Sequence, residues 1–212
     1  MDRMGDEELV NLARGVIEAD SRAVHAALGA LNEEFVRAAR LLSAGTGKVL
    51  VTGSGTSGAI ANRAAHLLSV CGTPAFFLAP ADGLHGGLGV LQPNDLLLAL
   101  SKSGSSDELN EFCRRAKSLC RGVVVVTAVP DSTLAALADH LICVKLAEDA
   151  DLGAVVATGS SLAISAIVDA LGEIGRVVRN YEWERVLFTH PSGAVGRKTL
   201  ESLERRTPAE EP

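Results

Sequence analysis

Short apolar runs alternate with longer helical patterns from residue 48 onward. The runs are KVLVTG (48–53), PAFFLA (74–79), DLLLAL (95–100), GVVVVTA (122–128) and HLICVKL (140–146). Because these runs are apolar on both sides of a strand, they predict a parallel sheet that is covered on both faces. The helical patterns cover 57–71, 106–120, 131–138 and 159–179. Strands that alternate with helices in this way indicate an α/β fold.

The first part of the chain carries a helical pattern of its own, over residues 6–43. Apolar side chains recur there at helical spacing, we place a break near Asp20 and Ser21, and Gly45 and Gly47 end the pattern. We expect this helical segment, 1–45, to clasp a partner subunit. The main domain is predicted at 46–198. It is followed by a charged tail, 199–212, which we expect to fray.

Composition narrows the function classes. The chain has 212 residues, of which 47% are hydrophobic, and a formal net charge of -6. An acidic chain without a basic run is a poor candidate for binding nucleic acid or an anionic membrane surface. The N-terminus has no apolar signal region, and no apolar run approaches the roughly 18 residues of a membrane span, so we expect a cytoplasmic protein. The four cysteines show no CxxC spacing and are interpreted as reduced, buried thiols.

The third apolar run ends in a cluster of hydroxyl groups. In LALSKSGSSDEL (98–109), Ser101 directly follows the strand, and Ser103, Ser105 and Ser106 come soon after it. Ligands of open parallel sheets bind beyond the carboxyl ends of the strands, where a helix start offers unpaired N–H groups and a positive dipole end. We interpret the loop as a phosphate cradle that contains Ser101, Ser103 and Ser106. The alternative is that Ser105 or Ser106 only caps the helix.

A glycine-rich loop follows the first apolar run, in TGSGTSG (52–58). Its glycines fit the G-x-G-x-x-G fingerprint of dinucleotide-binding proteins. Such proteins need an acidic residue at the end of the second strand, and here the first acid, Asp82, comes only after a proline. We therefore favour a second loop that contacts a sugar, with Ser54, Thr56 and Ser57 as hydrogen-bond donors.

Two histidines lie in glycine-rich surroundings. His190 begins HPSGAVGRK (190–198), and His85 lies in GLHGGLG (83–89). A lone histidine is more often structural or simply exposed, but chain-bending residues frame both of these. His190 and His85 are therefore candidates for a functional role, with the structural alternative left open.

Taken together, these stretches resemble the sugar isomerase (SIS) domain, and more narrowly the arabinose-5-phosphate isomerases. The most specific pieces are GTPAFFLAPADGLHGGLGVLQPNDLLLALSKSGSSDEL (72–109) and HPSGAVGRK (190–198). The resemblance implies a five-stranded, doubly wound parallel sheet of the flavodoxin-like kind. It also implies a homodimer or homotetramer whose active sites are shared between subunits.

The resemblance also implies an activity, which is the interconversion of an aldose phosphate and a ketose phosphate through a cis-enediol. This chemistry needs a base for the carbon-bound proton and groups that move protons at the two oxygens, and it requires no metal or organic cofactor. Ser101, Ser103 and Ser106 fall where the family holds the sugar phosphate. The implied catalytic residues are Glu108, His190, His85 and Asp149, with Glu148 as the alternative to Asp149.

The sequence departs from the family pattern at several positions. Thr56 stands where the arabinose-5-phosphate isomerases have an active-site lysine, and the residues after His190 are Pro-Ser-Gly instead of Pro-Gly-Gly. The loop at 157–162 has fewer hydroxyl groups than in those enzymes, and we expect no counterpart of the paired CBS domains of long members. Two alternatives therefore stay open: a non-catalytic phosphosugar sensor, and an isomerase for another sugar phosphate.

Overall fold

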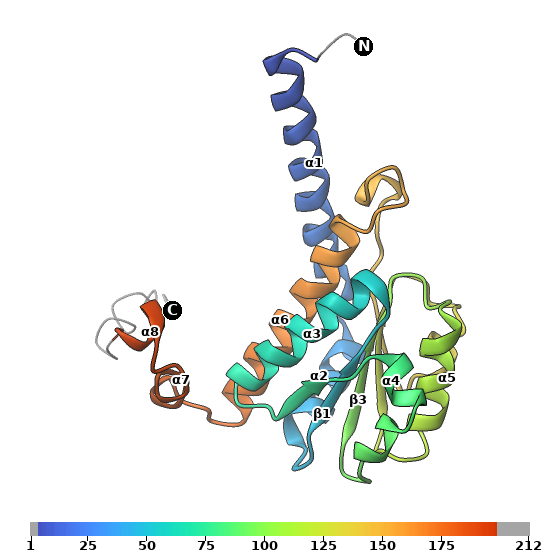
Figure 1. Cartoon of the computed structure of the whole chain (residues 1–212), viewed down its shortest axis with the longest axis vertical. Helices are drawn as coiled ribbons and strands as arrows, with labels where there is room; N and C mark the ends of the chain where they lie inside the picture. The colour runs from blue at the N-terminus through green and yellow to red at the C-terminus, as the bar shows by residue number, and fades with distance from the viewer. Residues whose placement is uncertain (1–3, 199–212) are drawn as a thin grey trace.

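The computed structural model describes residues 4–198, and a five-stranded parallel sheet lies at its centre (Figure 1). The strands are β1 (Val49–Thr52), β2 (Ala75–Phe77), β3 (Leu96–Leu100), β4 (Val123–Thr127) and β5 (His140–Cys143). They confirm all five predicted strands, in the order β2-β1-β3-β4-β5. The order reverses between β1 and β3, so a switch point lies at the carboxyl ends of these two strands.

Helices cover both faces of the sheet. The helices are α1 (Asp6–Ala26), α2 (Glu33–Ala44), α3 (Gly55–Val70), α4 (Pro80–Leu84), α5 (Asp107–Ala116), α6 (Gly159–Val178), α7 (Trp183–Thr189) and α8 (Gly193–Gly196). The side chains of Leu96, Leu98 and Leu100 join a core cluster with α2, α3 and α6. Leu97 and Ala99 face the opposite way, into a second cluster with α5. Because alternate residues of β3 enter different clusters, the sheet is doubly wound, as expected.

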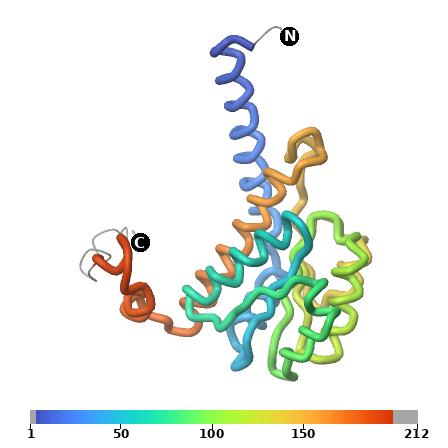
Figure 2. Tube along the Cα trace, viewed as in Figure 1, coloured from blue at the N-terminus to red at the C-terminus, as the bar shows by residue number. Residues whose placement is uncertain are grey.

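The leading helical segment contains a break, but not at the predicted place. Helix α1 runs without interruption through Asp20 and Ser21, and the chain turns instead at a short 3₁₀ segment, Ala27–Ala30. The prediction was wrong because the stronger boundary signals in this stretch are Gly29, which disfavours a helix, and Asn32, which caps the start of the next one. The first turns of α1 extend beyond the body of the molecule, while its last turns pack beside α6 (Figure 2).

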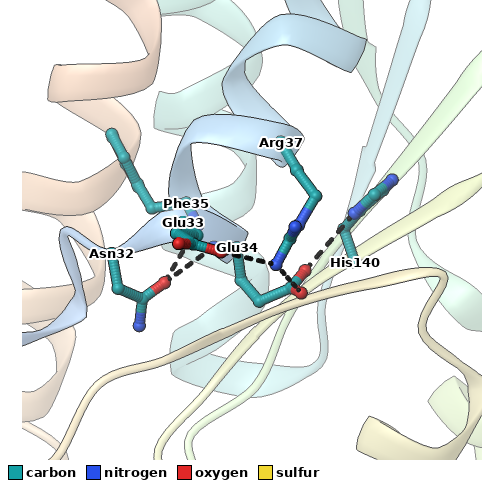
Figure 3. A network of polar contacts seen from close by, with 6 residues as sticks. All are labelled: Asn32, Glu33, Glu34, Phe35, Arg37 and His140. Atoms are coloured by element: carbon teal, nitrogen blue, oxygen red, sulfur yellow. Dashed lines mark hydrogen bonds and ion pairs between the residues drawn. The ribbon is translucent and has the colours of Figure 1, made fainter.

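Helix α2 is fixed to the sheet by a polar network at its first turn (Figure 3). The side-chain oxygen of Asn32 accepts hydrogen bonds from the backbone N–H groups of Glu34, at 2.9 Å, and Phe35, at 3.2 Å. The Glu34 carboxylate pairs with Arg37 at 2.8 Å and lies 3.5 Å from Nδ1 of His140, the first residue of β5. The capped helix therefore directs Phe35 into the core.

Three further sequence expectations need revision. Only Ala135–Leu137 is helical in the predicted helix 131–138, as a 3₁₀ turn whose first N–H donates to the Ser132 hydroxyl at 3.2 Å. Helix α5 ends at Ala116, before the predicted end at 120. Helices α4, α7 and α8 were not predicted, because each is too short to show a periodic pattern. The predicted tail, 199–212, lies outside the described residues.

The cysteines are reduced, as predicted, but most of them are less buried than expected. All four are free thiols. Cys113 is buried, and burial raises its pKa to about 12. Cys71, Cys120 and Cys143 are only partly buried, so the prediction of buried thiols is confirmed for Cys113 alone.

The helices of the described chain were also expected to be too short or too polar for a membrane span. Within residues 4–198, no helix combines the length and the apolar character that crossing a bilayer requires.

Candidate active site

The hydroxyl-rich loop after β3 is held in a defined shape by its own groups. The Ser101 hydroxyl is buried and accepts a hydrogen bond from the Gly104 N–H at 3.0 Å. The hydroxyl groups of Ser103 and Ser105 lie 2.8 Å apart. Gly104 has a φ of +64°, which favours glycine. Ser101 therefore shapes the loop from inside, whereas Ser103 and Ser105 are exposed at its surface.

The start of α5 presents backbone N–H donors that its N-cap side chain does not use, although the N–H of Glu108 is already engaged by the carboxylate of that residue. Ser106 occupies the N-cap position, but its hydroxyl makes no capping hydrogen bond. The first N–H groups of a helix have no partner within the helix, so they remain available to a ligand. Simple capping by Ser106, the alternative raised from the sequence, does not occur. The arrangement of the loop and the helix start suits an anion such as a phosphate group.

The glycine-rich loop before α3 brings strand and helix into close contact. A Cβ atom at Gly58 would lie 2.7 Å from the carbonyl oxygen of Gly53, and one at Gly53 would lie 2.8 Å from that of Ser57. Both glycines are therefore required by packing. Ser54 takes the N-cap position of α3, Ser57 is partly buried in the first turn, and Thr56 is exposed beside it.

A cleft of about 440 Å³ lies between this glycine-rich loop, the start of α4 and the first turn of α5. Glu108 is the ionisable residue among those that line it. Its own backbone N–H and the Ser54 hydroxyl lower the pKa of Glu108. The Ser54 hydroxyl is buried near this carboxylate without completing a hydrogen bond of standard geometry. The cleft thus holds a carboxylate that is ionised at neutral pH, which is the form a general base needs.

The fold agrees with a comparison to protein families. Residues 42–173 match the SIS domain. The chain belongs to the SIS domain family. Helices α7 and α8, with His190 between them, lie beyond the matched residues, so the predicted limits of the domain at 46 and 198 stay predictions.

Several individual proteins are similar to this SIS domain. It is 33% identical over 197 residues to the arabinose 5-phosphate isomerase KdsD of Pseudomonas aeruginosa, covering 93% of this chain and 60% of that protein. A Listeria monocytogenes structure, provisionally described as a sugar-phosphate isomerase, shares 30% identity with a TM-score of 0.85, over 90% of this chain and all of that one. A structure from Escherichia coli CFT073 in complex with a sugar phosphate has a TM-score of 0.84 at 24% identity, covering 89% of this chain and 100% of that one, and supports the fold.

The SIS domain contains an ion pair between a buried aspartate and a partly exposed lysine that sequence reasoning did not find. The carboxylate of Asp151, before α6, lies 2.6 Å from the ammonium of Lys102, and its other oxygen accepts from the N–H groups of Thr158 and Ser160, each at 2.9 Å. Burial raises the pKa of Asp151, but Lys102 and these N–H groups outweigh burial and lower it. The pair joins two loops far apart in sequence, and no local pattern signals it.

The other predicted catalytic residues of this SIS domain lie away from the Glu108 cleft of the same chain. Asp149 is exposed and pairs with Arg22 of α1 at 2.8 Å, while Glu148 lies beside it. His190 follows α7, on a segment separated from the sheet by α6 and α3 (Figure 1), and its Nδ1 lies 2.8 Å from the carbonyl oxygen of Val186. His85 is exposed at the end of α4. One chain alone therefore brings together Glu108, Ser54 and the hydroxyl-rich loop.

Side chains that could ligate a metal are scattered over the described part of the SIS domain. Within residues 4–198, no group of three or more His, Cys, Asp or Glu side chains is arranged to hold a metal ion. Among the described residues that line the cleft, the polar side chains are those of Glu108, Ser54 and Asn62.

Proposed function

We propose that this SIS domain is an isomerase that interconverts an aldose phosphate and a ketose phosphate. The observation that carries the proposal is the position of Glu108. Its carboxylate lines a cleft at the switch point of the sheet and belongs to the same helical turn that begins at the hydroxyl-rich loop. A phosphate bound at that loop would leave the sugar extending toward the carboxylate.

The chemistry assigned to Glu108 is a proton transfer between two neighbouring carbons. The carboxylate removes the proton from the carbon next to the carbonyl group, and the electron pair forms the double bond of a cis-enediolate. The protonated carboxyl group of Glu108, which can exchange its proton with solvent, then delivers a proton to the neighbouring carbon, while a second group moves a proton between the two oxygens. We assign this second task to His190, whose ring can both donate and accept a proton.

The site is complete only if another copy of the chain contributes to it. Glu108 and His190 lie on separate parts of one chain, whereas the proposed reaction needs both at one sugar. Helix α1 exposes large apolar side chains that favour burial against a second copy: Leu9, Val10, Leu12, Ile17 and Val24. We propose a homodimer or homotetramer in which His190 enters the cleft of a neighbouring subunit.

Arabinose 5-phosphate and ribulose 5-phosphate are the first substrate pair to test. The similarity to KdsD over 93% of this chain favours them, although the chain spans only 60% of the length of that relative. Thr56 replaces the family lysine, which favours a wider search among hexose and heptose phosphates. His85 and Asp149 remain candidates for the same site. Asp149 would contribute to it from the loop before α6.

The test combines a panel of pentose, hexose and heptose phosphates with two measurements. A thermal shift reports binding, and NMR in deuterium oxide reports exchange of the proton at the carbon next to the carbonyl group. We expect exchange and isomerisation with at least one of these sugar phosphates. Lack of both binding and exchange with every member of the panel would contradict the proposal.

A second candidate function is a non-catalytic phosphosugar sensor. The observation that favours it is the absence of a basic side chain among the described residues that line the Glu108 cleft, since Thr56 has replaced the family lysine. A sensor would bind a sugar phosphate in the thermal-shift assay but would not exchange its proton. The same panel therefore separates the two functions.

A further inference from the structure

The proposed reaction develops negative charge on the sugar, but no positively charged side chain is among the described residues that line the cleft. Glu108 is an anion, and the other described lining residues are glycine, alanine, serine, proline, phenylalanine and asparagine. An enediolate oxygen is stabilised most effectively by a fixed positive charge or donor that is already in place. The stabilising charge or donor therefore has to come from outside the described residues that line the cleft, and a loop of the same sheet edge is one source.

Two lysines lie in the described loops that follow the carboxyl ends of the strands. Lys145 comes after β5, the strand at the edge of the sheet, and it forms no ion pair with a described residue. Lys102 comes after β3, the central strand, which pairs with β1. The segment that follows β3 also leads to Glu108. Lys102 is therefore the lysine next to the switch point.

The backbone and the side chain of Lys102 are both held in place. Its carbonyl oxygen accepts hydrogen bonds from the N–H of Ala128 and the hydroxyl of Thr127, each at 3.0 Å. Its ammonium lies 2.6 Å from the Asp151 carboxylate, whose side chain is only 2% exposed, while the Lys102 side chain remains 40% exposed. The ammonium is thus anchored on one side and accessible on the other.

Asp151 does more than cap α6. One of its oxygens already accepts the N–H groups of Thr158 and Ser160, which satisfies the start of that helix. The other oxygen faces Lys102 and is not needed for capping. A lysine side chain has many rotamers in water, and an ion pair with a fixed carboxylate restricts them at little gain in stability, because the lysine is partly exposed.

We propose that Lys102 supplies the positive charge that stabilises the enediolate oxygen, and that Asp151 is a positioning residue that holds Lys102 at the site. This inference rests on the proposed isomerase function. Lys102 transfers no proton in the reaction. Its ammonium stays protonated and offers N–H donors to the oxygen that becomes negative when Glu108 takes the carbon-bound proton.

The test compares two ligands that differ at the reacting end. Phosphoerythronohydroxamate mimics the charged five-carbon enediolate, whereas arabitol 5-phosphate carries the phosphate but no carbonyl or enediolate group. Calorimetry on the full chain should show that Lys102→Met weakens hydroxamate binding at least about tenfold and arabitol phosphate binding less than about twofold. Lys102→Arg, which keeps the charge, should recover part of the loss. Lys145→Met is the matched control and should change neither affinity.

Asp151→Asn tests the positioning role, because the amide oxygen can still cap α6. We expect a selective loss of hydroxamate affinity, together with a lower kcat and a nearly unchanged KM. If the pair of Lys102 and Asp151 is purely structural, Asp151→Asn lowers the melting temperature and leaves the ratio of the two affinities unchanged. This result would overturn the positioning role. Equal losses for both ligands in Lys102→Met would place this lysine at the phosphate and overturn the assignment.

The outcome also separates this inference from the proposed function. If the original chain binds neither ligand and neither binds nor exchanges any sugar phosphate of the panel, both the isomerase function and the role of Lys102 are rejected. If it binds both ligands and Lys102→Met keeps the hydroxamate affinity, only the role of Lys102 is rejected. A selective loss in a chain that performs no proton exchange would support Lys102 as a ligand-binding residue and favour the sensor function.

Discussion

Asp95 holds Lys48 through both its backbone and its side chain, and so joins the start of β1 to the start of β3. One carboxylate oxygen of Asp95 accepts the backbone N–H of Lys48 at 3.0 Å, and the other pairs with its ammonium and accepts the N–H of Gln92 at 2.8 Å. Burial raises the pKa of Asp95, but the Lys48 ammonium and these N–H groups outweigh it and lower the pKa.

This relationship predicts how stability depends on pH. A carboxyl group whose pKa is lowered by folding adds stability above its unfolded pKa, about 3.9, and loses it as the pH falls through the folded value. Asp95→Asn should therefore lower the free energy of unfolding at neutral pH by about 2 kcal/mol and flatten its decline in acid. Urea denaturation between neutral pH and about pH 3 measures both effects. The exposed Asp131→Asn is the control, and identical curves for the two variants would contradict the prediction.

Gly104 is predicted to be intolerant of a side chain. Its φ is +64°, and a Cβ atom there would lie 2.2 Å from Oγ and 2.6 Å from Cβ of Ser132. Gly104→Ala should lower the free energy of unfolding by at least about 1–2 kcal/mol and weaken phosphosugar binding, because the hydroxyl-rich loop must move. Gly89→Ala is the matched control, since a Cβ atom there meets nothing within 4 Å. Denaturation and calorimetry of both variants provide the measurement.

The sequence predicted the sheet more accurately than the connections. Leu96–Leu100 and Val123–Thr127 were found because fully buried strands are continuous apolar runs, and both are buried at every position. Helix α4 begins with Pro80, a recognised start signal, but it is too short to be periodic. The break after α1 was misplaced because Asp20 and Ser21, two adjacent polar residues, resemble a helix boundary. The sequence alone does not show which face of the helix is exposed and can carry them.

In the candidate site, too, features within one short segment could be found from the sequence, whereas contacts between distant segments could not. Ser106 was singled out because it follows a strand in one short loop, and Glu108 because of the family resemblance; both lie at the start of α5, and their roles stay predictions. The pairing of Lys102 with Asp151 could not be predicted, since it depends on how the loop before α6 folds back over the sheet. The contact between Asp149 and Arg22 likewise depends on the direction in which α1 crosses that loop.

The phosphate cradle predicts a defined loss of affinity. Ser103→Ala combined with Ser106→Ala removes one hydroxyl group of the loop, which bonds only to Ser105, and one at the N-cap of α5, which makes no capping bond. A hydrogen bond to a charged group contributes about 1.5–3 kcal/mol, so sugar-phosphate affinity should fall at least about tenfold. Calorimetry with a sugar phosphate checks this. Ser118→Ala, near the other end of the helix, should leave the affinity unchanged. A folded double variant with full affinity would refute the placement.

Glu108→Gln should separate binding from turnover. The amide keeps the size of the side chain but cannot accept the carbon-bound proton. We expect turnover to fall by about 10²-fold or more while phosphosugar affinity is maintained. Asp107→Asn, an exposed acid in the same helical turn, is the control and should change little. Steady-state kinetics and deuterium exchange measure the effect. An unchanged rate would reject Glu108 as the base and make Asp149 the next residue to test.

The proposed sharing of the site predicts an oligomer with a specific pattern of activity. Light scattering at micromolar concentration should give a dimer or tetramer instead of the 22.0 kDa chain mass. Glu108→Gln and His190→Ala should each inactivate their own homo-oligomer. In a mixed dimer, however, the intact Glu108 of the His190→Ala chain meets the intact His190 of the Glu108→Gln chain. Random mixing should therefore restore about a quarter of the sites.

This recovery requires that the two residues of one site come from different chains. If they came from one chain, every site of a mixed oligomer would lack one of the two groups, and mixing would restore nothing. The measurement is the isomerisation rate after the two variants are unfolded and refolded together, compared with each variant refolded alone. A refolded mixture that forms oligomers but stays inactive would place Glu108 and His190 in the same chain's site. A conformational change would then have to bring α7 across α6.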